Sequence, residues 1–150
     1  EEMAYKASRF MLPIEEEYAP CEKTFAPPFT IANSYSNNEK YLHRVELQYL
    51  SGTVSYVLRN FYSSFCGIQY ALDGLLVKPC LSRSFGDFTI EFTYLGKKFT
   101  VNYVSSEEKS GEMTLNGEKL NTQINVCSGK KYALIKDCEF KNENLLTVWY

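Results

Sequence analysis

The hydrophobic residues in the first half of the chain are spaced as in amphipathic helices. Residues 1–12 place their apolar side chains on one stripe, which predicts a helix that Pro13 ends. A second helix is predicted from about Gly52 to Phe65. Residues 13–45 contain several prolines, many Asn and Ser, and no sustained period, so we expect a long irregular segment there. The apolar stripe of the second helix consists of Val54, Val57, Leu58, Phe61 and Phe65.

The segment at the start of the second helix has two interpretations. Ser51 is a residue type that caps helices, because its hydroxyl accepts a hydrogen bond from an N–H group of the first turn. Gly52 and Thr53 would then lie in that turn, and Gly67 suits the C-terminal end. The alternative is chemical, because the free N–H groups at a helix N-terminus bind anions.

After the second helix the hydrophobic period changes from 3.6 to 2. Residues 74–80 predict a short apolar strand, and residues 88–94 and 98–104 predict two alternating strands joined by a tight turn at Gly96. Asn116-Gly117 is a strong hairpin signal. The fold class is therefore α+β, with helices first and an antiparallel sheet or sandwich after them. Three further strands are predicted in QINVC, KYALIK and LLTVWY.

Composition excludes several classes of protein. The 150 residues carry a net charge of −2, so no basic footprint for nucleic acid or anionic lipid exists. No apolar run approaches the roughly 20 residues of a membrane span, and the acidic, mixed first residues are not those of a signal peptide. The first residue is not Met, so we expect a piece of a longer polypeptide.

The five cysteines, at positions 21, 66, 80, 127 and 138, are odd in number and contain no CxxC pair. Their spacings do not suit a zinc site, so no metal is expected. We interpret them as reduced, mostly buried thiols of a cytoplasmic protein. One disulfide with a spare thiol remains an alternative.

Four stretches, in this order and spacing, are similar to a known family. They are LPI at 12–14, PPFTIANSYSN at 27–37, QYLSGTVSYVLRN at 48–60 and GIQYALDGLLVKPCL at 67–81. Together they resemble the C-terminal portion of cellobiose phosphorylase-type inverting glycoside phosphorylases (glycoside hydrolase family ninety-four). The resemblance implies that residues 1–66 end a helical (α/α)6 barrel catalytic domain. It also implies that residues 67–150 form a C-terminal β-sandwich domain.

The resemblance implies an enzyme that cleaves β-glucosidic bonds with inorganic phosphate and inversion, giving sugar 1-phosphate. Its phosphate-binding residues would be Asn33, Ser51 and Gly52, with no cofactor and no metal. The family's general acid is expected upstream of this chain, so no catalytic residue is assigned here and the piece alone is expected to be inactive. The long FTIANSYSN stretch resembles family members that act on oligoglucans more than it resembles cellobiose phosphorylase itself.

The expected partners are an oligosaccharide, phosphate and the remainder of the same polypeptide. Family members are often dimers through other regions, so a homo-oligomer is compatible with the resemblance. A different class of function is a non-catalytic β-sandwich that binds carbohydrate or docks onto another domain. Exposed aromatic residues on one sheet face would favour carbohydrate binding, and an exposed apolar face on the helix at 52–65 would favour docking.

Overall fold

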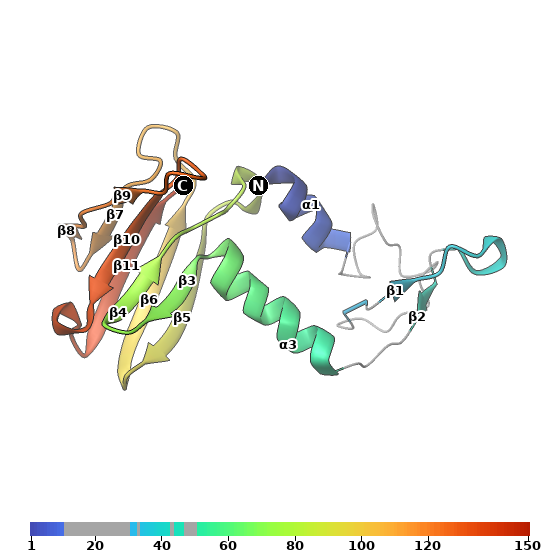
Figure 1. Ribbon diagram of the computed structural model, residues 1–150, viewed down its shortest axis with the longest axis horizontal. Helices are drawn as coiled ribbons and strands as arrows, with labels where there is room; N and C mark the ends of the chain where they lie inside the picture. Colours follow the sequence, from blue (N-terminus) through green and yellow to red (C-terminus); the bar gives the residue numbers. More distant parts are fainter. Residues whose placement is uncertain (11–30, 33, 43, 47–50) are drawn as a thin grey trace. The chain divides into compact units, whose positions relative to one another are not determined.

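The computed structural model describes residues 1–10, 31–32, 34–42, 44–46 and 51–150. The chain divides into two compact units, Glu1–Asn60 and Phe61–Tyr150. The predicted α+β class is confirmed, with most of the ordered structure in sheets (Figure 1). Pro13, which was expected to end the first helix, lies outside the described residues.

The first unit contains short elements and one small buried cluster. Ala32 and Val45 are buried there, and Tyr35 packs against them. Strand β1 pairs with β2 in an antiparallel ladder of two residues each, at the end of the segment 13–45 that was expected to be irregular. The elements of this unit are α1 (Glu2–Phe10), β1 (Ser34–Tyr35), the 3₁₀ helix η1 (Glu39–Tyr41), β2 (Val45–Glu46) and α3 (Ser51–Asn60).

The predicted second helix is present but differs at its ends. Helix α3 begins at Ser51, so Ser51 is its first helical residue and not the cap that precedes the helix. After Asn60 the chain continues as a π-helical turn, η2 (Phe61–Phe65), in which the N–H of Cys66 donates to the carbonyl oxygen of Phe61 over 2.9 Å. Gly67 follows with φ of 73°, as expected of a glycine at a helix end.

The second unit contains two sheets whose inward side chains form one hydrophobic core. The four-stranded sheet has the order β3-β4-β10-β9, and the five-stranded sheet has the order β5-β6-β11-β7-β8 (Figure 1). The strands are β3 (Ile68–Ala71), β4 (Gly74–Val77), β5 (Phe88–Tyr94), β6 (Lys97–Val104), β7 (Met113–Leu115), β8 (Glu118–Lys119), β9 (Gln123–Ile124), β10 (Lys131–Lys136) and β11 (Glu143–Trp149).

The two predicted hairpins are confirmed, and the predicted antiparallel pairing holds for every pair of strands in this unit except one. β5 and β6 pair around Gly96, and β7 and β8 pair around Asn116-Gly117. β11, however, pairs in parallel with β6 along its whole length, from Glu143 opposite Lys98 to Trp149 opposite Val104. Its other edge pairs antiparallel with β7, so β11 joins the two hairpins into one sheet.

A buried tyrosine ties the segment between η2 and β3 to the core. The Tyr103 hydroxyl donates to the carbonyl oxygen of Cys66 over 2.8 Å. Its ring stacks on Phe88, with ring centroids 4.8 Å apart. Phe61 and Phe65 of η2 pack against the same core, which anchors this turn to the five-stranded sheet.

The expectation of mostly buried thiols is wrong for the described cysteines. Cys66 is buried, whereas Cys80, Cys127 and Cys138 are exposed, and all four are free. Cys21 lies outside the described residues. Burial raises the pKa of the Cys66 thiol to about 12, because the thiolate would lose its hydration.

The thiols are therefore expected to react unequally. At about pH 8, iodoacetamide should label Cys80, Cys127 and Cys138 in the native chain and leave Cys66 unlabelled, because only thiolates react and Cys66 is a buried thiol. Peptide mass spectrometry measures the labelling at each position, and labelling in guanidinium chloride is the control. Native labelling of Cys66 at the rate of the other three would show that the core does not enclose Cys66.

Candidate functional site

The structure describes the sequence-predicted phosphate site only in part. Asn33 lies outside the described residues. Ser51 and Gly52 are the first two residues of α3, a helix of 10 residues, although the Ser51 side chain is not described. The first N–H groups of any α-helix have no acceptor within the helix, which is why helix N-termini bind anions.

The space around the Gly52 Cα atom is not filled by other described residues. It is exposed, and a Cβ atom added there would meet no described atom within 4 Å beyond its neighbours and its own helical turn. Neither a positive φ nor a close backbone contact within the described residues requires glycine at this position. A glycine inside a helix lowers its stability relative to alanine, so the local fold alone does not explain Gly52.

Three other polar residues, His43, Arg44 and Asp73, lie near the predicted phosphate-binding residues or in the turn that follows β3 in the sequence. His43 lies outside the described residues. The Arg44 guanidinium lies 5.6 Å from the centroid of the Tyr41 ring, which is cation–π geometry. Asp73 lies in the turn between β3 and β4, and its carbonyl oxygen accepts from the N–H of Asp137 over 3.0 Å. These contacts give Arg44 and Asp73 structural roles.

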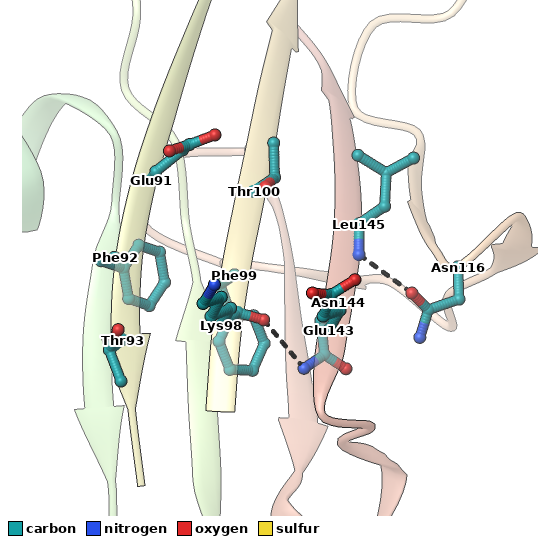
Figure 2. Close-up of a pocket in the computed structure, with 10 residues that line it drawn as sticks. All are labelled: Glu91, Phe92, Thr93, Lys98, Phe99, Thr100, Asn116, Glu143, Asn144 and Leu145. Atoms are coloured by element: carbon teal, nitrogen blue, oxygen red, sulfur yellow. Dashed lines mark hydrogen bonds between the residues drawn. The ribbon is translucent and has the colours of Figure 1, made fainter. Parts of the chain in front are cut away.

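A second candidate site is a hollow of about 600 Å³ on the outer face of the five-stranded sheet. Figure 2 shows its lining residues on β5, β6, β11 and the turn between β7 and β8. This face is opposite the core, because Phe99 and Val101 of β6 point inward and are buried. We call this feature the sheet hollow. Its outward side chains are Glu91, Thr93, Lys98, Thr100, Glu143 and Leu145.

Strand register places these six side chains in two rows. Thr93 lies opposite Lys98, which lies opposite Glu143, so these three form the first row. Glu91, Thr100 and Leu145 form the second row by the same pairings. Neighbouring strands are about 4.8 Å apart and rows on one face about 7 Å apart, so both rows belong to one continuous surface.

The charged side chains of the sheet hollow have no polar partner among the described residues. Glu91, Lys98 and Glu143 are exposed, and none forms an ion pair or a side-chain hydrogen bond within the part of the chain that the structure describes. Lys98 and Glu143 are cross-strand neighbours and still do not pair. The surface therefore presents two carboxylates and one ammonium group that are available to a ligand.

Two asparagines form the rim of the sheet hollow at its β11 side. The N–H of Leu145 donates to Asn116 Oδ1 over 2.9 Å, and Asn116 adopts φ of 51°. Asn116 Nδ2 is buried and has no hydrogen-bond partner among the described residues. The Asn144 amide group, in contrast, has both of its donors satisfied, because Nδ2 donates to the carbonyl oxygens of Lys98 and Lys141 (Figure 2 shows the first of these bonds).

Sequence reasoning missed the sheet hollow. The alternating pattern of 88–94 and 98–104 identified the polar face of each strand, but it did not say which strands would be neighbours. Glu143 and Leu145 reach this surface only because β11 inserts beside β6.

Within the described residues, no group of three or more His, Cys, Asp or Glu side chains could hold a metal ion. None of the described helices is both long enough and apolar enough to cross a membrane. Comparison of the sequence with protein-family models and with curated proteins gives no match.

Proposed function

We propose that this chain is the C-terminal part of an inverting glycoside phosphorylase, in which the start of α3 helps to bind inorganic phosphate. The observation that carries the proposal is Gly52, an exposed glycine in the first turn of α3 for which the described structure offers no local reason. A glycine there lets an anion approach the N–H groups of a helix N-terminus closely. Ser51 adds a hydroxyl donor beside it, and Asn33 an amide.

The chemistry of phosphorolysis explains why such a turn is useful. An inverting hydrolase uses one carboxylic acid to protonate the leaving oxygen and a second carboxylate to activate water. Phosphate is already a nucleophile, so the second carboxylate is unnecessary and the protein must instead hold a dianion beside the sugar. The positive end of the α3 dipole stabilises such a charge. The acid that protonates the leaving oxygen would come from another part of the polypeptide.

The proposed architecture agrees with the order of elements along the chain. Residues 1–66, with α1 and α3, would be the last part of an (α/α)6 barrel, and residues 67–150, with both sheets, the closing β-sandwich. The exposed thiols of Cys80, Cys127 and Cys138 suit a reducing compartment such as the cytoplasm. The products would be a sugar 1-phosphate and a shortened β-linked glucan.

The test uses the gene product that contains this sequence. It is incubated with inorganic phosphate and a panel of β-linked gluco-oligosaccharides, and glucose 1-phosphate is measured. Ser51→Ala and Asn33→Ala should each raise the KM for phosphate by about 10- to 100-fold, because a hydrogen bond to a charged group contributes about 1.5–3 kcal/mol. Ser64→Ala, on the exposed side of η2, is the matched control.

Gly52→Ala separates the phosphate role from a purely structural one. If Gly52 served only the helix, alanine would stabilise the protein by about 0.5–1 kcal/mol and leave turnover unchanged. If phosphate approaches this turn, the added methyl group should raise the KM for phosphate without loss of stability. Absence of glucose 1-phosphate with every oligosaccharide tested, or unchanged KM in all three variants, would refute the proposal.

A second candidate is a module that docks onto another domain without chemistry. The observation in its favour is the exposed apolar side of α3, where Val54 is 40% and Leu58 is 53% exposed. The barrel proposal also accounts for these residues, since neighbouring barrel helices would cover them. Phosphate affinity in the intact protein distinguishes the two, because a docking module has no reason to bind phosphate at Ser51.

A further inference from the structure

We propose that the sheet hollow binds a neutral oligosaccharide, as a site separate from the start of α3. The proposal does not depend on phosphorolysis, because it rests on the surface of the five-stranded sheet alone. The hollow of about 600 Å³ has the size of ordinary ligand sites, although it is an open surface of the sheet.

The arrangement of charge favours a neutral ligand with many hydroxyls. Glu91 and Glu143 accept hydrogen bonds, and Lys98 donates them. With two carboxylates and one ammonium group the hollow has a net charge of −1, counted from these three residues, which disfavours phosphate and other anions. Sugar hydroxyls donate hydrogen bonds to carboxylates and accept them from an ammonium group.

The separation of the carboxylates argues against a metal ion. Glu91 and Glu143 lie two strands apart and in different rows, which is about 10 Å across the strands and about 7 Å along them. Oxygen ligands of Ca²⁺ or Mg²⁺ lie about 2.0–2.6 Å from the ion, so these two groups cannot share one. An elongated ligand, such as a short chain of sugar rings, contacts both.

The remaining lining groups fit the same ligand. Thr93 and Thr100 add hydroxyl groups. None of the six outward side chains is the exposed aromatic ring expected of a carbohydrate-binding sheet, and Leu145, which is 47% exposed, offers the apolar contact to the C–H face of a sugar ring in its place.

The hollow is held by rigid elements. Its six outward side chains are carried by three paired strands, and Asn144 bonds the start of β11 to Lys98 of β6. Asn116 is held against Leu145 by two bonds, since its own N–H donates to the Leu145 carbonyl oxygen over 2.7 Å. The backbone that carries the ligand-facing groups is therefore fixed before a ligand binds, whereas the side chains of Glu91, Lys98 and Glu143, unpaired among the described residues, become ordered on binding.

The experiment titrates the full 150-residue chain with linear β-linked glucose tetramers, without phosphate, and follows backbone amide shifts by NMR. Saturable shifts are expected at Glu91, Lys98, Thr100 and Glu143 for one of the tetramers, with a Kd in the millimolar range or tighter. The double variant Glu91→Gln, Glu143→Gln should bind at least about tenfold more weakly, because amides are poorer acceptors for sugar hydroxyls than carboxylates.

The matched control is Glu108→Gln, an exposed glutamate outside the hollow, which should bind as the unaltered chain does. Dispersed spectra of each variant show that it is folded. No saturable shift up to about 20 mM for any tetramer, shifts confined to other surfaces, or equal binding by the double variant and the control would each overturn the proposal. Saturable shifts of the hollow residues by inorganic phosphate or Ca²⁺ alone would also overturn it.

Discussion

Gly67→Ala is expected to destabilise the unit Phe61–Tyr150 by at least about 4 kcal/mol, which is much of the stability of a domain of this size. A Cβ atom at Gly67 would lie 1.9 Å from the carbonyl oxygen of Lys78, and the backbone already has φ of 73°. The N–H of Lys78 donates to the Gly67 carbonyl oxygen over 2.9 Å, so the two segments cannot separate without losing this bond. Urea unfolding followed by tryptophan fluorescence of Trp149 measures the change.

Gly96→Ala is the matched control for this prediction. Gly96 has nearly the same φ, 72°, but no described atom lies within 4 Å of its added Cβ. The only cost that then remains is that of placing an alanine at positive φ, which is about 1–2 kcal/mol. The difference between the two variants therefore measures the backbone clash at Gly67. Equal destabilisation of the two would show that Lys78 moves aside and that no backbone clash occurs at Gly67.

The second large effect is expected at Phe99, at the centre of the core of the same unit. Phe99 is 1% exposed, its ring stacks on Phe92 with centroids 5.3 Å apart, and it meets Phe140 edge-on at 4.9 Å. Phe99→Ala should lower the free energy of unfolding by about 3–5 kcal/mol. The variant loses the buried apolar surface of the ring, and it also leaves a cavity between the rings of Phe92 and Phe140, which the surrounding structure holds in place. The free energy of unfolding in urea is the measurement.

Two variants bracket this result. Phe99→Leu retains most of the apolar volume, so its cost should be clearly smaller than that of Phe99→Ala. Thr100→Ala changes the next residue of β6, which faces the sheet hollow and not the core, and should change stability by about 0.5 kcal/mol or less. A cost below about 1.5 kcal/mol for Phe99→Ala would mean that the core closes around the missing ring.

The predictions that held depended on residues close together in the chain. The alternation in 88–94 and 98–104, with Gly96 between them, is enough to specify a hairpin, and β5 and β6 have this form. Asn116 at positive φ followed by Gly117 forms the second hairpin as expected. Turn chemistry and side-chain period act within about ten residues, so sequence alone reports them.

The predictions that failed depended on distant parts of the chain. β3 was not identified, because Gln69 and Tyr70 are adjacent and both exposed, so the strand has no alternation to detect. The exposure of Cys80 follows from where its segment passes over the surface. A cysteine has the same local pattern whether it is buried or exposed, so its environment is a tertiary property.

The chain by itself determined where helices give way to strands, which side chains of β5 and β6 face inward, and where two hairpins turn, because local sterics and burial set these features. It also carried the Ser51-Gly52 segment, and α3 begins there. Only the tertiary structure decided that β11 runs parallel to β6. That pairing joins residues more than 40 positions apart, and it alone brings Glu143 beside Lys98 and creates the sheet hollow, since strand direction and neighbours are set by packing of the whole core.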